Sequence, residues 1–588
     1  MLVTKKYDST ERKRLISVCM GLEDADLVLA GGYVIDVALG EIRRADIAVK
    51  GKSVAYVSDV GKVRAGPSTN LIDIAGKYVA PGFLDSHAHV ESTMLTSSAY
   101  ASLVLRCGTT GAVIDPHEVA NVSGLEGVRA LLKDANNTPF KFYVQIPSCV
   151  PSAPGLETSG CTLDASAIEM LQELEGVWGL GEMMSYDKVL EGDNETLGKI
   201  RLAYERGMVV DGHSPLLRGE RFQAYASSGV MTDHTSRTEE EVLERLRSGV
   251  HTMIQDRPGE SSFEAIVDVL KKVDTRRAMF CTDDIEPDEV EERGHVVSLV
   301  RKAVDLGLDP IKAVQMATLN VAETYLIESE LGIIAPGRYA DLVIFHDLKE
   351  FTVDKVFANG SLAVSQDVLL IERPKPDFQR FRHTVKLRQD LTPEDFLLRV
   401  KLKSGRSLAR VVTVDGELME RELEVSDHHV APNPADDTVR MAVLERHGRN
   451  GNIGKGFISG TGLKRGAIAS SISHDAHNLV CIGVSENDMY QAVREVEKVG
   501  GGMVAVMSGG VLAKVELPFF GLLSDDLNVC KAIKELRKAV LDMGLKIPFR
   551  KLMFLSLPVG RGNYKITDIG LVNYAEKEVL SPLVSLSS

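Results

Sequence analysis

The stretch Tyr78-Val79-Ala80-Pro81-Gly82-Phe83-Leu84-Asp85-Ser86-His87-Ala88-His89-Val90-Glu91 decides the fold. An apolar run typical of a buried strand ends here in a His-x-His pair, and an acid follows shortly after it. In an extended chain His87 and His89 project from the same face, because side chains alternate with period two. Two imidazoles on one face can hold a single metal ion. The alternative is two surface histidines at the start of a loop, and the pair alone does not decide between these interpretations.

The same pattern, an apolar run that ends in polar residues before a helical stretch, recurs until the chain has eight strand candidates. Their polar ends are His87-Ala88-His89, Asp115-Pro116-His117-Glu118, Pro147-Ser148-Cys149, Glu182-Met183-Met184, Asp211-Gly212-His213, Asp233-His234, Gln255-Asp256-Arg257 and Thr282-Asp283-Asp284. Helical periodicity predicts helices at 125–133, 165–174, 195–206, 239–247, 263–273, 296–306 and 310–327. Eight β-then-α units are typical of a TIM barrel, whose active site lies at the carboxyl ends of its strands. A doubly wound open sheet is the alternative, but eight units in series favour closure.

Short strands split by glycine turns flank the barrel on both sides, at 27–74 and 332–360. Their similarity indicates that the two flanks combine into one small β domain. The predicted class is therefore α/β: a distorted (β/α)8 barrel inserted in a small β-sandwich domain, followed by a second α/β domain. The predicted boundaries are an N-terminal arm at 1–22, the discontinuous sandwich at 23–79 and 332–373, the barrel at 80–331 and the C-terminal domain at 390–588.

The composition excludes several classes of protein. A net charge of −15 over 588 residues argues against a nucleic-acid surface, which needs a basic stripe. No apolar run reaches the roughly 18 residues of a membrane span, and residues 1–6 lack the apolar core of a signal peptide. Seven scattered cysteines without a Cys-x-x-Cys pair fit reduced thiols rather than a disulfide framework or a zinc-thiolate site. We therefore expect a cytoplasmic protein.

Six of the strand-end residues are of types that bind metals. They are His87, His89, Glu182, His213, His234 and Asp283. Apart from the first pair, each ends a different strand, so all would face one cavity mouth. Four imidazoles and two carboxylates without a nearby thiolate suit one or two divalent ions, and Mn, Fe and Zn are all admissible. Any one of these residues alone is more often a core or surface group, but five agreeing strand ends are improbable by chance. Glu182 is placed to bridge two ions.

Two features of the C-terminal domain need interpretation. Gly500-Gly501-Gly502 invites comparison with a phosphate cradle, but no Lys-Ser/Thr follows and no helix begins there, so a turn is favoured. His474 and His477 would share one face if they lay on a helix, beside Asp475 and Asn478, which allows a metal or substrate contact. We favour a satisfied polar cluster or an interface for this group.

A family resemblance follows from these motifs. Pro81-Gly82-Phe83-Leu84-Asp85-x-His87-x-His89, with Asp26…Gly31 before it and Ala335-Pro336-Gly337-x-x-Ala340-Asp341-Leu342 after the barrel, resembles the amidohydrolase superfamily. More narrowly, the chain resembles the bacterial adenine deaminase family in His89-Val90-Glu91-Ser92-Thr93-Met94, Asp115-Pro116-His117-Glu118-x-x-Asn121, Gly181-Glu182-Met183-Met184, Asp211-Gly212-His213, Cys281-Thr282-Asp283-Asp284 and Ser473-His474-Asp475-x-His477-Asn478. The resemblance extends over nearly the whole chain, including the C-terminal domain that most amidohydrolases lack.

The resemblance implies a metal-dependent hydrolase of purine salvage that converts adenine to hypoxanthine and ammonia. The implied ligands are His87, His89 and Asp283 for the more buried ion, His213 and His234 for the second ion, and Glu182 for the bridge. Many members of the superfamily bridge with a carboxylated lysine, so Glu182 argues against a dihydroorotase or urease type. The family is associated with a binuclear Mn(II) or Fe(II) centre, and the ligand types also admit Zn(II).

The implied chemistry gives the other strand-end residues a role. A metal lowers the pKa of water from about 15.7 to roughly 7, and the resulting hydroxide attacks C6 of adenine. Asp283, beside the metal, is expected to move the proton to the leaving amine. The residues expected to bind substrate and deliver a proton to a ring nitrogen are Asp115, His117 and Glu118. The alternative for Asp115-Pro116 is a strand-ending turn with a buried acid. Asp284 is expected to orient Asp283 or a helix start.

Two other interpretations stay open. A different hydrolase on the same scaffold would act on another cyclic amidine, amide or N-acyl amino acid, although an amide hydrolase has less use for the Asp-Pro-His-Glu strand end. A catalytically dead scaffold or metal-binding regulator is the other, and the intact ligand set argues against it. The His-x-Glu and Pro-Cys-x-x-Cys motifs of the zinc deaminases are absent, which excludes that mechanism. The expected partners are adenine and a second copy of the chain in a homodimer.

Overall fold

The computed structural model describes residues 8–584 apart from 64, 172–173 and 561. Its first element is helix α1 (Ser9–Cys19), which begins at Asp8 because the Asp8 Oδ1 atom accepts the N–H of Thr10 at 2.8 Å. The helix contacts strand β3 (Ser53–Ser58). Of the N-terminal arm predicted at 1–22, residues 1–7 lie outside the described residues.

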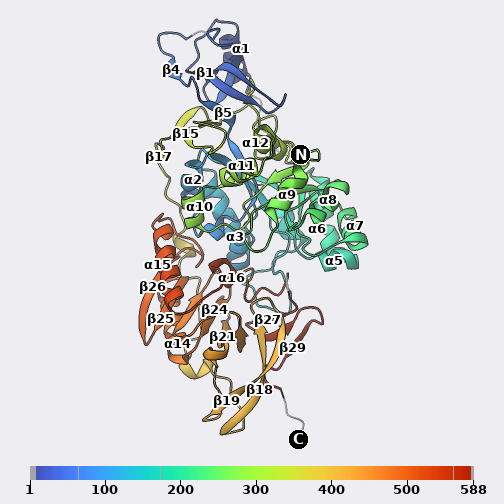
Figure 1. Cartoon of the computed structure of the whole chain (residues 1–588), viewed down its shortest axis with the longest axis vertical. Coiled ribbons are helices and arrows are strands. Elements are labelled where there is room, and N and C mark those ends of the chain that lie inside the picture. Colours follow the sequence, from blue (N-terminus) through green and yellow to red (C-terminus); the bar gives the residue numbers. More distant parts are fainter. Residues whose placement is uncertain (1–7, 64, 172–173, 561, 585–588) are drawn as a thin grey trace.

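Segments from both sides of the barrel form one nine-stranded sheet. Its strands are β1 (Leu27–Asp36), β2 (Glu41–Lys50), β3, β4 (Asn70–Asp73), β5 (Tyr78–Pro81), β14 (Leu342–Phe345), β15 (Val353–Ala358), β16 (Ser361–Ser365) and β17 (Val368–Leu369). The order is β17-β16-β15-β14-β5-β1-β2-β3, with β4 paired to β1. β5 pairs with β1 in parallel and with β14 antiparallel, where Pro81 lies opposite Leu342. The chain thus leaves this sheet at β5 and returns beside the same strand at β14 (Figure 1).

Eight parallel strands follow β5 and form the barrel. They are β6 (Phe83–Ala88), β7 (Thr109–Ile114), β8 (Lys141–Ile146), β9 (Val177–Met183), β10 (Val209–Gly212), β11 (Thr232–Asp233), β12 (His251–Ile254) and β13 (Ala278–Phe280). They divide into the sheets β6–β10 and β11–β13. Met231 N–H donates to Val210 O at 2.9 Å across one gap, and Asp283 N–H donates to His87 O at 3.0 Å across the other. These bonds close the ring, so the predicted distorted (β/α)8 barrel is confirmed.

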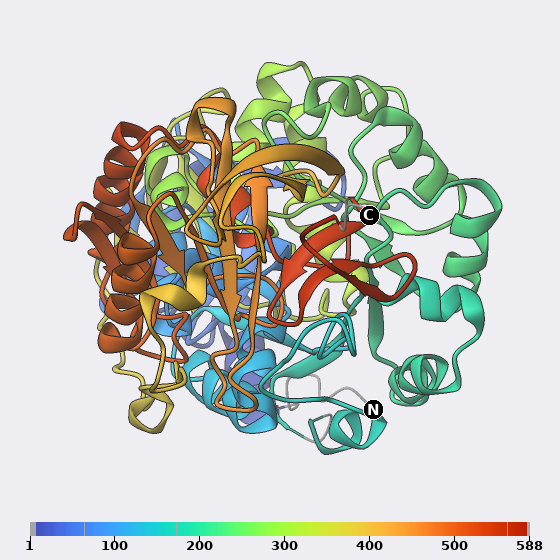
Figure 2. The ribbon, with the colours of Figure 1, turned by 90° about the horizontal axis from the view of Figure 1, so that it is seen from below.

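Helices surround the barrel strands (Figure 2). They are η1 (Val90–Thr93), α2 (Ser97–Leu105), α3 (His117–Ala135), α4 (Ala165–Leu171), α5 (Tyr186–Glu191), α6 (Asn194–Glu205), α7 (Gly219–Ser227), α8 (Glu239–Arg247), α9 (Phe263–Leu270), α10 (Pro287–Arg293), α11 (Val296–Asp305), α12 (Pro310–Met316) and α13 (Leu319–Thr324). The helix predicted at 310–327 is therefore two helices, because Thr318 leaves the helical region at φ −144°. The one predicted at 125–133 is the second half of α3, which is kinked at Gly124 with φ 58°.

The C-terminal domain is built on a second nine-stranded sheet. Its strands are β18 (Ser404–Thr413), β19 (Leu418–Ser426), β20 (His429–Val430), β21 (Thr438–Leu444), β22 (Ile453–Ser459), β23 (Ala467–Ser470), β24 (Leu479–Gly483), β25 (Gly502–Met507) and β26 (Gly510–Glu516). The order is β20-β19-β18-β22-β21-β24-β23-β25-β26. The other elements are η2 (Gln379–Phe381), η3 (Pro393–Phe396), η4 (Pro434–Asp436), α14 (Glu486–Val499), α15 (Val529–Asp542), α16 (Phe549–Met553), β27 (Tyr564–Thr567), β28 (Gly570–Asn573) and β29 (Glu578–Leu580).

Two expectations about this domain have different outcomes. The turn predicted at the glycine run is confirmed, since Gly500 ends α14 at φ 87° and Gly502 begins β25. The helix on which His474 and His477 would share one face is not present at these residues. Both lie in the turn that joins β23 to β24, where His477 has a φ of 55° that no helix accommodates.

The C-terminal domain lies against the end of the barrel at which the carboxyl ends of its strands meet (Figure 2). Thr567 Oγ donates to Leu156 O at 2.6 Å, and Thr158 N–H donates to Asp568 Oδ1 at 2.9 Å. Helix α15 also packs on α10, where Arg537 Nη2 lies 2.8 Å from Asp288 Oδ2. The barrel mouth is therefore bordered by a second domain. Among the described helices, none is both long and apolar enough to cross a membrane.

Candidate active site

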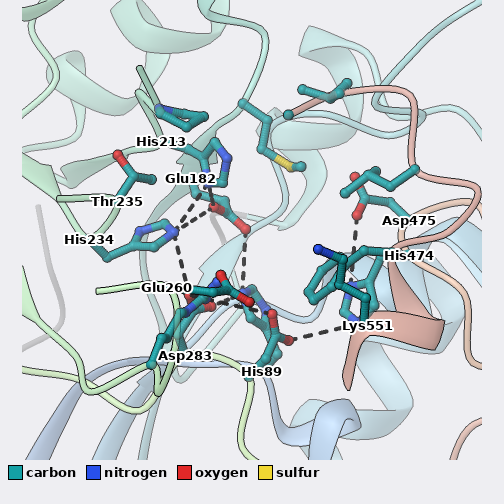
Figure 3. Close-up of a pocket in the computed structure, with 18 of the residues that line it drawn as sticks. His89, Glu182, His213, His234, Thr235, Glu260, Asp283, His474, Asp475 and Lys551 are labelled. Atoms are coloured by element: carbon teal, nitrogen blue, oxygen red, sulfur yellow. Dashed lines mark hydrogen bonds and ion pairs between the residues drawn. The ribbon is translucent and has the colours of Figure 1, made fainter. Parts of the chain in front are cut away.

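Residues from the barrel strand ends and from the C-terminal domain line one cavity of about 250 Å³ (Figure 3). The barrel supplies His89, His117, Glu182, His213, His234, Arg257, Asp283 and Asp284. The C-terminal domain supplies His474, Asp475, Lys551, Phe554 and Lys565. The predicted ligand His87 lies next to this wall and is completely buried. All six predicted metal-binding residues are therefore gathered at one end of the barrel.

Three of these residues converge on one point. His87 Nε2 and His89 Nε2 are 3.2 Å apart, and Asp283 Oδ1 lies 3.3 Å from His89 Nε2 and 3.9 Å from His87 Nε2. In a tetrahedral shell with bonds of about 2.0–2.2 Å, neighbouring ligand atoms are about 3.3–3.6 Å apart. The two imidazoles and the carboxylate therefore fit a single divalent ion.

A second group of ligand atoms lies beside the first. Glu182 Oε2 is 2.5 Å from His213 Nδ1 and 3.1 Å from His234 Nε2, and these two ring nitrogens are 3.2 Å apart. The other oxygen, Glu182 Oε1, faces the first group at 3.4 Å from His89 Nε2. One carboxylate thus presents an oxygen to each group, which is the arrangement of a bridging ligand between two ions.

Groups behind the ligands fix the orientation of the rings. His89 Nδ1 lies 2.9 Å from Asp115 O, and His87 Nδ1 lies 3.5 Å from Asp211 Oδ2. Tyr325 donates its hydroxyl to Asp211 at 2.9 Å and so holds that carboxylate in place. Because the outer nitrogen of each of these two rings faces an oxygen, the inner nitrogen is directed at the metal position. Donor types, spacing and support all fit a pair of divalent metal ions.

Arg257 is a member of the site that sequence reasoning did not select. Its guanidinium donates from Nη2 to Asp283 Oδ2 and lies 4.0 Å from Asp284. Burial raises the pKa of Asp283, but Arg257, His234 and His89 outweigh burial and hold this pKa well below its ordinary value. Asp283 is therefore ionised at neutral pH. Arg257 lies three residues beyond the end of strand β12 (His251–Ile254), and its position after a strand was the signal that could have identified it.

The three predicted residues at the end of β7 occupy different places. His117 lines the cavity, with Nδ1 3.5 Å from Glu182 Oε1. Asp115 is buried outside the lining, where its Oδ2 accepts the backbone N–H of Glu182 at 2.9 Å. Glu118 is also buried behind the cavity wall, 3.7 Å from His89 Nδ1. Both His117 and Glu118 belong to the first turn of α3.

Asp284 lines the cavity next to Asp283. It accepts a hydrogen bond from Ser92 Oγ at 2.5 Å, and its Oδ1 lies 3.8 Å from His474 Nε2. It does not begin a helix, since α10 starts at Pro287. Asp284 therefore lies where the barrel meets the C-terminal domain.

His474 and Asp475 complete the cavity from the C-terminal side (Figure 3). His474 Nδ1 is 3.2 Å from Glu118 Oε1, and Asp475 Oδ1 is 3.6 Å from His117 Nε2. The cluster is not the satisfied one expected for this motif, because His474 Nε2 and Asp475 Oδ2 have no hydrogen-bond partner among the described residues, and both residues line the cavity. The His-Asp-x-His-Asn motif was visible in the sequence, but nothing in it indicated which distant residues it would face.

Comparison with known proteins identifies the family of this chain. The model of the amidohydrolase family matches residues 78–363, and the model of the adenine deaminase C-terminal domain matches residues 414–578. An adenine deaminase of Moorella thermoacetica is 37% identical over 586 residues, which cover 97% of this chain and 98% of the relative. One of Archaeoglobus fulgidus is 40% identical over 580 residues, covering 96% and 97%. The chain belongs to the adenine deaminase family. The resemblance and the metal-dependent hydrolase predicted from the motifs are confirmed.

The matched adenine deaminase C-terminal domain, residues 414–578, contains both His474 and Asp475, which form part of the second wall of this cavity. Burial lowers the pKa of His474 below its ordinary value, which keeps its ring neutral. Burial also raises the pKa of Glu118 well above its ordinary value. Lys565, on the same wall, has its pKa lowered by burial to about 8.

Proposed function

We propose that this protein hydrolyses adenine to hypoxanthine and ammonia. One observation carries the proposal: relatives named adenine deaminase align with nearly the whole chain at 37–40% identity, including both walls of the cavity. The C6–N bond of adenine breaks, a C6–O bond forms from water, and the amine leaves as ammonia. Chain residues must therefore hold the ring, take a proton from water and return one to the leaving amine.

The proposed metal ligands are the residues that meet at the two groups of ligand atoms. They are His87, His89 and Asp283 for one ion, His213 and His234 for the other, and Glu182 for the bridge. When bound, divalent ions lower the pKa of water toward neutrality and so supply a nucleophile. Mn(II) or Fe(II) is the proposed identity, with Zn(II) admissible from the ligand types.

Asp283 is the proposed proton carrier. Its Oδ2 faces Arg257, while its Oδ1 faces the histidine ligands, so the carboxylate lies at the edge of the cavity in a fixed orientation. Its low pKa makes it the ionised acceptor for a proton of water. The protonated carboxyl group of Asp283 then returns the proton to the leaving amine. Arg257 acts on this step as a positioning residue, because it reaches the reaction only through Asp283.

The residues at the end of β7 are proposed to serve the purine ring. His117 lines the cavity and is proposed to contact the ring directly. Asp115 and Glu118 lie behind the wall, so they are proposed to act through neighbours: Asp115 by fixing the backbone of Glu182, and Glu118 through His474. Asp284, in contact with both Ser92 and the C-terminal wall, is proposed to orient the mouth of the site.

Ammonia release tests this function. The chain is expressed with and without added Mn(II), its metal content is measured, and turnover of adenine is compared with adenosine and cytosine. We expect metal-dependent turnover of adenine alone. A fully metallated protein without adenine turnover would move the substrate to another cyclic amidine, an amide or an N-acyl compound. A homodimer in the cytoplasm remains part of the proposal, and sedimentation of the purified chain tests the dimer.

A further inference from the structure

Asp85 is a buried carboxylate to which the proposed function gives no role. It lies on β6, two residues before the proposed metal ligand His87, and it is 0% exposed. Because side chains alternate along a strand, Asp85 and His87 project from the same face of β6. Asp85 does not line the cavity, however. It can therefore act on the site only through the groups that it contacts.

The hydrogen bonds of Asp85 join two segments that are far apart in the sequence. Its Oδ1 atom accepts the backbone N–H of His87 at 3.2 Å and that of Thr282 at 3.1 Å. Its Oδ2 atom accepts the hydroxyl of Thr282 at 2.6 Å. Thr282 lies two residues beyond the end of β13 and directly precedes Asp283. One carboxylate thus holds both the strand that carries His87 and the segment that carries Asp283.

The segment after β13 needs this support because of its backbone conformation. Asp283 has a φ of 54°, in the left-handed region that is unfavourable for a residue with a β-carbon. Such a conformation persists only where the surrounding contacts enforce it. The N–H of Asp283 donates to His87 O at 3.0 Å, and its carbonyl accepts the N–H of His89 at 3.2 Å. These bonds hold Asp283 itself, and Asp85 holds the residue before it.

A neutral histidine restricts the orientation of the Asp85 carboxylate. His295 Nε2 lies 3.3 Å from Asp85 Oδ2 and 3.2 Å from the hydroxyl of Tyr100. Its Nδ1 atom lies 3.0 Å from Thr109 Oγ1 on β7. Burial lowers the pKa of His295 to about 3, so the ring is uncharged at neutral pH. His295, Tyr100 and Thr109 are all fully buried, so polar groups of fixed position enclose the carboxylate.

We propose that Asp85 is a positioning residue that holds His87 and Asp283 at the spacing required by one metal ion. The inference rests on the proposed function, which assigns these two residues to the same ion. Asp85 contacts neither the substrate nor the reacting atoms, and it acts through Thr282 and the backbone of His87. Groups that orient metal ligands typically change metal affinity or activity by about 10- to 100-fold when they are removed. We expect an effect of this size from Asp85.

The first test measures metal affinity in the absence of substrate. Metal-free wild type, Asp85→Ala and Asp85→Asn are titrated with Mn(II), and binding is followed by the rise in Tm and by competition with a chelator. We expect Asp85→Ala to bind Mn(II) about 10- to 100-fold more weakly than wild type. Asp85→Asn keeps an oxygen that can accept the two backbone N–H groups, so its affinity should lie between those of wild type and Asp85→Ala.

Asp268→Ala is the matched control for this titration, because the Asp268 side chain is 62% exposed on the barrel helix α9. Its affinity for Mn(II) should equal that of wild type. Wild-type affinity in a folded Asp85→Ala variant would overturn the proposal, whether or not adenine is the substrate.

The second test uses Thr282 and does not depend on the folding of Asp85→Ala. Thr282→Val preserves the shape of the side chain but lacks the hydroxyl that donates to Asp85, whereas Thr282→Ser retains a hydroxyl. We expect Thr282→Val to bind Mn(II) about tenfold more weakly, since the lost hydrogen bond has a charged acceptor. Thr282→Ser should recover most of the affinity. Equal affinity in Thr282→Val and wild type would overturn the proposal.

Kinetics at saturating Mn(II) separate positioning from a loss of folded or metallated protein. With kcat expressed per folded, metallated chain, we expect Asp85→Ala to lower kcat for adenine by about tenfold or more and to leave KM within about threefold. The reason is that Asp283 acts in the chemical step. Wild-type kcat in fully metallated Asp85→Ala would overturn the proposal. Absence of adenine turnover by wild type would instead refute the proposed function and leave the comparison of metal affinities valid.

Discussion

The two walls of the cavity differ in how closely their polar groups approach one another. On the barrel wall, Glu182, His213 and His234 face one another at 2.5–3.2 Å. On the C-terminal wall, His474 Nε2 and Asp475 Oδ2 have no hydrogen-bond partner among the described residues. Within the same described residues, unpaired ring nitrogens also occur on the barrel wall, at His117 and His234. Since buried polar groups are nearly always paired, both walls are open to a ligand that brings polar atoms of its own. From this difference we infer that the barrel wall binds metal ions and that the C-terminal wall binds an organic ring.

The largest effect is expected from the barrel wall. Glu182→Gln replaces one carboxylate oxygen by an amide nitrogen, which cannot bridge two cations. We expect metal content to fall below two equivalents per chain and kcat/KM for adenine to fall by about a thousandfold or more. Metal analysis and ammonia release measure both quantities. Glu169→Gln, on the outer helix α4, is the matched control. A Glu182→Gln protein with two tightly held metals and full activity would refute the bridging role.

Arg257→Leu is expected to change the pH dependence of the same wall. Arg257 lowers the pKa of Asp283, so its removal raises that pKa. Because Asp283 must be ionised to accept a proton, the acidic limb of the kcat/KM profile should move to higher pH. At the acidic end of the range, we expect a loss of about 10²-fold. Arg257→Lys keeps a cation, so the acidic limb of its kcat/KM profile should lie close to that of the wild type. An unmoved acidic limb in Arg257→Leu would show that the guanidinium does not control Asp283.

His474→Ala tests whether the C-terminal wall acts independently of the metals. The ring lies 3.2 Å from Glu118 and is not a member of either metal-ligand group. We expect two equivalents of metal to be retained, with kcat/KM for adenine about tenfold lower. Metal analysis and steady-state kinetics on one preparation provide the comparison with Glu182→Gln. Loss of metal from His474→Ala would contradict the division between the two walls.

The smallest effect is expected from Glu157, a buried acid close to Asp475 of the C-terminal wall. Burial raises the pKa of Glu157 from its ordinary 4.5 to about 8, and the nearby Asp475 adds to the rise. The folded state therefore favours the protonated acid, and this contribution to stability is lost as pH rises from about 4.5 through about 8. Glu157→Gln imitates the protonated acid. It should reduce the fall in Tm between acidic and alkaline buffer by a few degrees, measured by thermal denaturation. If Tm of Glu157→Gln falls with pH as steeply as that of the wild type, Glu157 does not cause this part of the pH dependence.

Much of the barrel wall could be predicted from the sequence because the fold places it. Once eight β-then-α units are counted, the strand ends must meet, and His89, Glu182 and His213 follow from that rule. Arg257 also follows a strand, but its pairing depends on Asp283, whose φ of 54° no periodicity predicts. The C-terminal wall is harder still. His474 meets Glu118 across more than 300 residues of chain, and only the docking of one domain on another decides that contact.

The pairing of β5 with β14 has a consequence for synthesis on the ribosome. β5 meets β14 only after residues 82–341 have emerged, so the first sheet keeps an open edge while the whole barrel is being made. The barrel wall of the cavity is complete once residue 284 has been translated, whereas Asp475 emerges almost two hundred residues later. A nascent chain thus contains all of the proposed metal ligands well before it contains the C-terminal wall. A chain cut short between the two would retain the proposed ligands but lack one side of the cavity.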